Sequence, residues 1–167
     1  MQNLDPQQTA RLRSTLLSSA QQFNPDWANS DGRIVVPAPE INNIEGDPEA
    51  EAILHAFASA GYREIYCMTT EEIGPDDPNQ AVLATLDEVA DWRWSTAPFD
   101  AVLVSTDVRA AVLFSVDEFL LVAGNPTFVE SALNKPIAAA LEEFTAYAEE
   151  MAEASRHLPR IARAYNQ

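Results

Sequence analysis

Three short apolar runs lie close together in the second half of the chain: Ala101–Val104, Ala110–Val116 and Phe119–Val122. They are rich in Val, Leu and Phe and are separated by polar breaks, a pattern typical of strands. It predicts a three-stranded antiparallel meander with Asp117-Glu118 as a two-residue hairpin loop. Because the runs are nearly continuous rather than alternating, we expect strands that are covered on both faces.

Apolar residues at helical spacing before and after the meander predict helices. Most expected starts join a capping residue to a proline, which suits the first helical position because it has no backbone N–H. These starts are Asp5-Pro6, Asp47-Pro48, Asp77-Pro78 and Asn125-Pro126. We expect the first helix to continue to Asn24. The second should end at Gly61 and the third near Asp91.

The C-terminal part of the chain predicts one long helix that begins at Lys135-Pro136. Its apolar residues form a heptad-like stripe between Ile137 and Leu158. Pro159 should kink or break this helix. Such a stripe fits the core or a contact between two copies, so a homodimer through residues 137–158 is one expectation.

Two further segments are predicted to add strands to the meander. Tyr62–Met68 alternates between two faces, and Arg33–Val36 is a short β-branched run that Pro37–Pro39 should end. No linker or internal repeat divides the chain. The sequence therefore predicts a single compact α+β domain over residues 1–167, with a mostly antiparallel sheet built on the meander (about 100–124) and covered by helices.

The chain has 167 residues, of which 47% are hydrophobic, and this is enough for one domain with its own core. No apolar run approaches the length of about 18 residues that a membrane span needs. The first residues lack the apolar core of a secretory signal, so we expect a cytoplasmic protein. Cys67 is the only cysteine, which excludes an internal disulfide and favours a reducing compartment.

Charge is the strongest compositional signal. The chain carries 26 acidic and 10 basic residues, a net charge of −16. Residues 36–91 alone hold 13 acidic residues and one arginine. Such a field repels nucleic acid and anionic membranes and attracts cationic partners, so we expect a basic protein partner, no nucleic acid and no membrane. The alternative is that the acidity only keeps the protein soluble.

The sequence lacks the short motifs that mark nucleotide and hydrolase sites, such as GxGxxG, GxxxxGK[ST], GxSxG, HExxH and SxxK. Cys67 lies in an apolar segment, which favours a buried side chain over an activated thiolate. His55 and His157 are too few for a zinc or copper site, and the loop Glu71–Asp77 lacks the spacing of a calcium loop. We therefore expect no catalytic residue, no metal site, no cofactor and no enzymatic activity.

The acidic segment also lies close in sequence to aromatic residues, and aromatic anchors surrounded by charge are typical of protein interfaces. Carboxylates on a rigid frame also resemble the charge of a phosphate backbone. The candidate partner-binding residues are Glu40, Glu45, Asp47, Glu49, Glu51, Glu71, Glu72, Asp76, Asp77, Trp92 and Trp94.

These features favour an acidic binding protein that inhibits a basic partner. Bacterial immunity proteins, which neutralise basic nuclease-type toxins by blocking their surface, are similar to this chain in size, acidity and order of elements. An adaptor, a chaperone-like protein or an oligomeric assembly subunit is the alternative, with the stripe over residues 137–158 as its contact surface. The third hypothesis is a hydrolase that depends on carboxylates alone.

Overall fold

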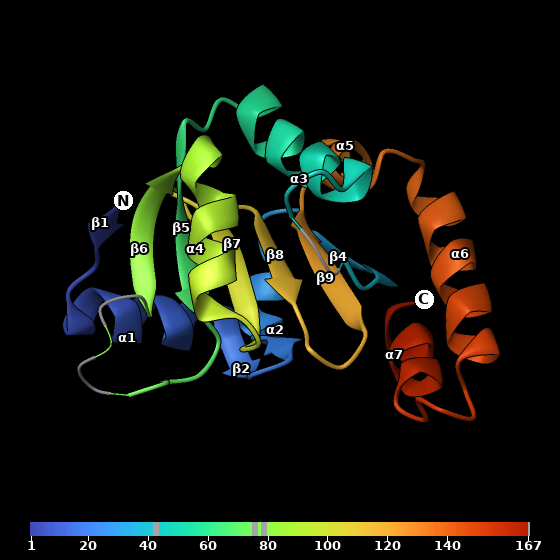
Figure 1. The fold of residues 1–167 in the computed structure, drawn as a ribbon. Coiled ribbons are helices and arrows are strands. Elements are labelled where there is room, and N and C mark those ends of the chain that lie inside the picture. Colours follow the sequence, from blue (N-terminus) through green and yellow to red (C-terminus); the bar gives the residue numbers. More distant parts are fainter. Residues whose placement is uncertain (42–43, 75–76, 78–79, 167) are drawn as a thin grey trace.

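The computed structural model describes residues 1–41, 44–74, 77 and 80–166 (Figure 1). They form one α+β domain around a seven-stranded sheet of the order β1-β6-β5-β7-β8-β9-β4, in which every neighbouring pair is antiparallel. The predicted fold class is confirmed. The strands are β1 (Gln2–Asn3), β4 (Ile34–Pro39), β5 (Glu64–Thr69), β6 (Ala81–Thr85), β7 (Ala101–Ser105), β8 (Ala111–Phe114) and β9 (Phe119–Gly124). A separate ribbon pairs β2 (Leu17–Ser19) with β3 (Gln22–Phe23).

The predicted meander is β7, β8 and β9, which pair in sequence order at the centre of the sheet. Its second turn is one residue longer than expected. Ser115 N–H donates to the carbonyl oxygen of Phe119 (3.0 Å), so the loop is Val116–Glu118 rather than Asp117-Glu118. A two-residue loop needs Gly or Asn at positive φ, whereas a three-residue loop needs one left-handed residue, here Glu118 at φ 76°.

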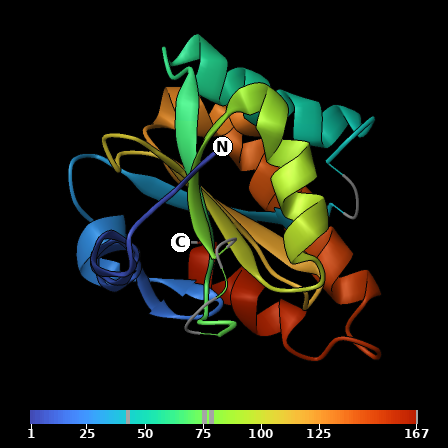
Figure 2. The ribbon, with the colours of Figure 1, turned by 60° about the vertical axis from the view of Figure 1, so that its left-hand side comes forward.

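Helices cover both faces of the sheet, as the continuous apolar runs predict (Figures 1 and 2). One face is covered by α3 (Pro48–Ser59), α4 (Val89–Thr96) and α5 (Pro126–Leu133). The other is covered by α1 (Pro6–Leu16), α2 (Pro25–Ala28), the β2–β3 ribbon and α7 (Leu158–Tyr165).

Alternate side chains of each central strand enter the two cores. In β7, Ala101 and Leu103 join the core under α3, α4 and α5, while Val102 and Val104 join the core under α1 and α7. The helix α6 (Ile137–Glu150) closes the sheet beside β4 and contributes to both cores. This double burial explains why the strands lack polar positions.

Three predicted helix starts are confirmed by their caps. Asp5 accepts the backbone N–H of Gln8 (2.8 Å) ahead of α1, Asp47 accepts that of Glu49 (2.9 Å) ahead of α3, and α5 follows a capping asparagine. The end of α3 is also as predicted, since Gly61 has a φ of 97° directly after it.

The predicted end of the first helix is wrong. The chain leaves α1 at Leu16 and forms the β2–β3 ribbon, so Phe23 reaches the core from a strand instead of from the helix. Asn24, the expected terminator, instead caps the short helix α2 by accepting the N–H of Asp26 (3.0 Å).

The predicted third helix is also wrong in its first half and at its end, since α4 continues past Asp91 to Thr96. Residues 81–85 form β6, a 3₁₀ turn follows at Leu86–Glu88, and only then does α4 begin. The predicted start of this helix was Asp77-Pro78, and Pro78 lies outside the described residues. The spacing of Val82 and Val89 fits a strand followed by a helix as well as one helix, and pairing with β5 decides in favour of the strand.

The remaining boundaries differ near prolines. β4 continues through Pro37 to Pro39, which an edge strand tolerates because one side of its backbone needs no partner. The predicted C-terminal helix is two helices, since α6 ends at Glu150 and Pro159 occupies the first turn of α7. No helix of the described residues is long and apolar enough to cross a membrane.

Candidate protein-binding surface

The register of the sheet brings several turns of the chain to one end. Ala101 pairs with both Thr69 and Phe114, and Phe119 pairs with Pro39. The residues just beyond these pairs therefore follow one another along this end: the start of the β5–β6 connection, the residue before β7, the β8–β9 loop and the residue after β4.

Carboxylates occupy most of these positions. We call this set the acidic end of the sheet, and its described members are Glu40, Glu71, Glu72, Asp77, Asp100, Asp117 and Glu118. They come from four segments that are far apart in sequence. Like charges brought together by the fold raise the local negative potential above what each segment produces alone.

Neighbouring charges of the acidic end shift one another's pKa values. Burial raises the pKa of Glu40, and the neighbouring charge of Glu118 raises it further. Burial likewise raises the pKa of Tyr147 on α6, and the charges of Glu40 and Glu118 add to this effect. The two carboxylates therefore act on the same region although 77 residues separate them in sequence.

Asp100 is the second carboxylate of the acidic end whose pKa is shifted by neighbouring charges. Burial raises the pKa of its carboxyl group, and the charges of Asp117 and Glu71 raise it further. Hydrogen bonds from the backbone N–H of Val116 (2.5 Å) and from Gln21 act in the opposite direction. Three segments of the acidic end are thus coupled through one partly buried carboxylate.

The β8–β9 loop is held in place by the C-terminal helices. The Tyr147 hydroxyl donates to the carbonyl oxygen of Glu118 (2.7 Å), and the Ser155 hydroxyl donates to the Glu118 carboxylate. A ring nitrogen of His157 lies 2.5 Å from the carbonyl oxygen of Asp117. The loop therefore presents its carboxylates on a fixed frame. Arg93 on α4 places one cation near Asp100.

A hollow of about 870 Å³ lies beside the acidic end, between α1, the β2–β3 ribbon and the β5–β6 connection. Its acidic lining residues are Glu71, Glu72 and Asp77. Arg13 on α1 also lines it and ties the connection to the helix, since its Nε donates to the carbonyl oxygen of Thr69 (3.0 Å). Its Nη2 donates to Thr69, Gln80 and the Glu71 carbonyl. Burial lowers the pKa of Arg13, and the charge of Glu72 opposes this.

The structure divides the predicted contact residues into two groups. Glu40, Glu71, Glu72 and Asp77 belong to the acidic end, whereas Asp76 lies outside the described residues. Glu45, Asp47, Glu49 and Glu51 instead lie around the start of α3. Asp47 caps this helix, and the two glutamates that follow are in its first turn, where the helix dipole favours negative charge. Helix stabilisation therefore accounts for Asp47, Glu49 and Glu51, and a contact role for the second group stays a prediction.

The two predicted tryptophans differ completely in exposure. Trp92 is 0% exposed and lies in the core under α4, so its prediction as a contact residue is wrong. The helix α4 packs one of its faces against the sheet, and Trp92 lies on that face. Trp94 is 83% exposed and is available to a partner.

The residues considered for catalysis and metal binding lie apart. Cys67 is fully buried in β5, and burial raises the pKa of its thiol far above the usual range. His55 contacts Ser59 on the exposed side of α3, whereas His157 contacts the β8–β9 loop. Among the described residues, no group of three His, Cys, Asp or Glu side chains could hold a metal ion.

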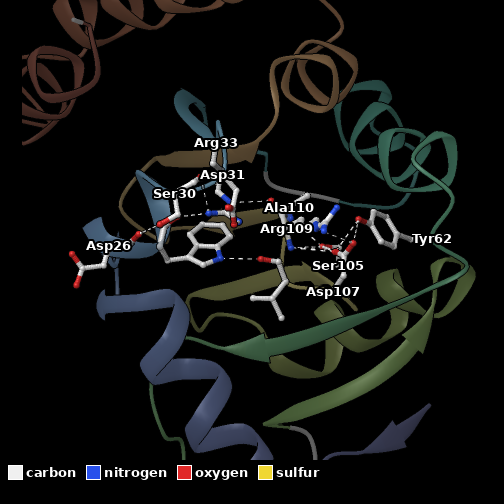
Figure 3. A network of polar contacts seen from close by, with 11 residues as sticks. Asp26, Ser30, Asp31, Arg33, Tyr62, Ser105, Asp107, Arg109 and Ala110 are labelled. Atoms are coloured by element: carbon white, nitrogen blue, oxygen red, sulfur yellow. Dashed lines mark hydrogen bonds and ion pairs between the residues drawn. The ribbon is translucent and has the colours of Figure 1, made fainter.

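The opposite end of the sheet has paired charges (Figure 3). The buried guanidinium of Arg33 lies 4.1 Å from the centroid of the Trp27 ring, and its Nε donates to the carbonyl oxygen of Arg109 (3.0 Å). The indole N–H of Trp27 donates to the carbonyl oxygen of Val108 (2.8 Å). Asp31 is 3.9 Å from Arg33 and forms an ion pair with it.

A second carboxylate of this end, Asp107, is surrounded by donors. It accepts hydrogen bonds from the hydroxyl groups of Tyr62 (2.8 Å) and Ser105 (2.8 Å) and from the backbone N–H of Arg109 (3.2 Å). Burial raises the pKa of Asp107, but these hydrogen bonds outweigh burial and lower it. The two ends differ in the result, since the pKa of Asp100 at the acidic end stays raised although its carboxylate also accepts hydrogen bonds.

Sequence reasoning missed Asp100, Asp117 and Glu118 as members of the surface. A signal was present, because an antiparallel meander places the residue before its first strand next to the loop after its second. The three residues flank the predicted strands in this way.

Comparisons with known proteins give no assignment: no family model, no curated protein and no solved structure matches this chain significantly.

Proposed function

We propose that this chain is an acidic binding protein that docks the acidic end of its sheet on a basic protein and blocks the function of that protein. A bacterial immunity protein that neutralises a basic, nuclease-type toxin is the class that it fits best. The observation that supports this proposal most directly is the convergence of seven carboxylates from four segments at one end of the sheet.

The physical argument concerns desolvation and charge. Burial and like charges both disfavour ionisation of Glu40 and Asp100. Such an arrangement lowers the stability of the isolated protein, and a cationic surface that covers it would remove the repulsion. Asp100 also accepts a hydrogen bond within the chain, from the N–H of Val116, but its pKa stays raised. At the opposite end hydrogen bonds lower the pKa of Asp107, so covering that end with cations offers a smaller gain.

The two other hypotheses receive less support. The stripe that motivated an assembly subunit includes Phe144, Ala148 and Leu158, all of which are buried inside this one chain. A carboxylate hydrolase would need its perturbed acids in a pocket. Glu40 and Asp100 do not line the large hollow beside the acidic end.

A growth-rescue experiment tests the proposal. The chain is co-expressed with the product of the reading frame next to its own gene, where that product is toxic alone. Wild type should restore growth, and the variant E71Q/E72Q/D117N should restore it poorly. The matched control E142Q/E149Q/E150Q removes three exposed charges from α6 and should rescue like wild type.

Purified proteins provide the second measurement. The association rate of the pair should fall as salt rises from 50 to about 500 mM, because screening shortens the range of the attraction. Equal loss of rescue in the two variants would mean that only total charge matters. Rescue that is unaffected in both would contradict docking through the acidic end.

A further inference from the structure

We propose that the exposed ring of Trp94 receives an arginine side chain of the basic partner, with the Asp91 carboxylate as the second contact of its guanidinium. This inference rests on the proposed function and names the anchor at which the acidic end meets the partner. Three observations support it: an exposed tryptophan without partners, a carboxylate on the same side of its helix, and exposed apolar residues that join this helix to the acidic end.

Trp94 differs from the two other tryptophans of the chain. It is 83% exposed, whereas Trp27 is 8% and Trp92 is 0% exposed. Within the part of the chain that the structure describes, no hydrogen bond, ring stacking or cation–π contact engages the Trp94 indole. Large aromatic side chains of this kind are the residues that most often anchor protein interfaces.

Another tryptophan of the chain shows the contact that Trp94 lacks. The indole ring of Trp27 carries the guanidinium of Arg33, whose central carbon is 4.1 Å from the ring centroid. Arginine and tryptophan are the cation and the ring that favour this contact most. A guanidinium that comes from outside the chain can make the same contact with the open face of Trp94.

Asp91 supplies a carboxylate beside the ring. It lies three residues before Trp94 on α4, both residues are exposed, and residues three apart are neighbours on a helix surface. The helix dipole favours Asp91 in the first turn of α4 but leaves its oxygens open to a donor. A guanidinium that lies flat on the indole can direct N–H groups to this carboxylate, which an ammonium group cannot match in geometry.

Two exposed apolar side chains lie among the carboxylates of the acidic end. Phe99 and Val116 are each 48% exposed. They directly precede Asp100 and Asp117 in the chain, and the backbone N–H of Val116 donates to the Asp100 carboxylate (2.5 Å). The acidic end therefore combines apolar surface with charge, as the centre and the rim of an interface do.

Arg93 fastens the end of α4 to this region. Its Nη1 donates to the carbonyl oxygen of Phe99 (2.8 Å). Burial lowers the pKa of Arg93, and the charge of Asp100 opposes this effect. Because Trp94 follows Arg93 directly, its ring lies at the border of the acidic end, where α4 leads into β7 (Figure 1).

Charge complementarity decides what covers this border. We call Asp91, Trp94, Phe99 and Val116 the Trp94 patch. A second copy of this chain would bring the same carboxylates and a net charge of −16 against it and would be repelled, as would an anionic membrane. A basic protein is attracted instead, and its arginine side chains offer both the charge and a planar face for the ring.

The indole signals in an NMR spectrum test the inference without the partner. The ¹⁵N-labelled protein has three tryptophans, and Trp94→Phe identifies the Trp94 indole signal by its loss. Wild type is titrated with acetyl-Arg-Leu-Arg amide and, in parallel, with the citrulline analogue, which has nearly the same shape and no charge. The arginine peptide should shift the Trp94 indole signal and the amides of residues 91–95, and the citrulline peptide should not. The lysine analogue should bind more weakly at the same place.

Two variants sharpen the test. Trp94→Leu keeps an apolar side chain but removes the ring, so the dissociation constant of the arginine peptide should rise about threefold or more. Its melting temperature should equal that of wild type, because the ring is exposed. Asp91→Asn should weaken binding by about twofold or more, whereas Glu142→Gln on the exposed side of α6 should leave it unchanged.

Equal binding of the citrulline peptide, shifts that spare the Trp94 indole, or unaltered binding to Trp94→Leu would each overturn the inference. A dimer in ultracentrifugation that Trp94→Leu abolishes would also overturn it, because a second copy would then cover the patch. These outcomes differ from failure of the proposed function. Growth rescue that needs the carboxylates of the acidic end but not Trp94 would refute only the anchor. Binding of the arginine peptide at Trp94 without any rescue would refute the role as an inhibitor.

Discussion

The most direct test of the structure concerns the buried arginine at the end of the sheet opposite the acidic residues. The side chain of Arg33 is 4% exposed and joins its own segment, which includes Trp27 and Ser30, to the distant turn at Arg109. Its Nη1 donates to the carbonyl oxygens of Trp27 and Ser30, and its Nε donates to that of Arg109. We predict that Arg33→Met, which keeps much of the volume, destabilises the fold.

The magnitude follows from which acceptors lose their donors. The carbonyl oxygens of Trp27 and Ser30 also accept backbone N–H groups, from Ser30 and Arg33 respectively, so they keep one partner each. The Arg109 carbonyl oxygen loses its donor, at a cost of about 1–3 kcal/mol for a buried acceptor. The contact with the Trp27 ring adds about 0.5–1 kcal/mol.

Removing a buried charge returns part of this loss, because the guanidinium no longer has to be desolvated. We therefore expect a decrease of about 1–3 kcal/mol in the free energy of unfolding. For a domain of this size it corresponds to a decrease of roughly 2–12 °C in melting temperature. Arg33→Lys should also lose more than about 1 kcal/mol, because one ammonium group cannot reach carbonyl oxygens on both sides.

Urea denaturation followed by circular dichroism measures these values, with the slope m compared between variants to confirm that the same surface unfolds. Arg11→Met, on the exposed side of α1, is the control and should change stability by less than about 0.5 kcal/mol. The reasoning is refuted if Arg33→Met is as stable as this control at an unchanged slope.

Three further predictions concern single side chains. The Cys67 thiol should resist alkylation at pH 8 in the folded protein and react after denaturation, because burial raises its pKa; rapid modification of the native protein would contradict this. Trp92→Ala should cost about 3–5 kcal/mol in urea denaturation, whereas Trp94→Ala should cost less than about 0.5 kcal/mol, and similar losses would contradict the assigned burial. Glu40 has a raised pKa when folded, so its contribution to stability is present below the unfolded pKa of about 4 and is lost as pH rises through the folded value. Glu40→Gln should therefore be more stable than wild type at pH 7 and equally stable at pH 3. A stability difference between variant and wild type that is larger at pH 3 than at pH 7 would contradict this prediction.

The elements that were predicted best depend on contacts between near neighbours in sequence. The caps at Asp5, Asp47 and Asn125 are formed by hydrogen bonds within two or three residues, so local sequence is sufficient to find them. The meander was found because its three strands follow one another directly. The errors at Leu16 and at β6 have the opposite cause, since both segments are decided by what they pack against.

The candidate surface was only partly predictable for the same reason. Composition identified residues 36–91 as the most acidic part of the chain, and Glu40, Glu71, Glu72 and Asp77 do lie at the acidic end. Composition could not separate these residues from the glutamates that stabilise α3. Nor could it exclude Trp92, whose burial follows from the direction in which α4 faces the sheet.

The sequence by itself determined the fold class, the meander, most helix starts and the coverage of the sheet on both faces, because these follow from periodicity and capping. Tertiary structure alone decided which carboxylates lie together and that Trp92 is buried whereas Trp94 is exposed. The physical reason is that strand order and register join segments as far apart in sequence as Ile34 and Gly124. Electrostatic coupling and burial depend on these distances in space, which no local pattern contains.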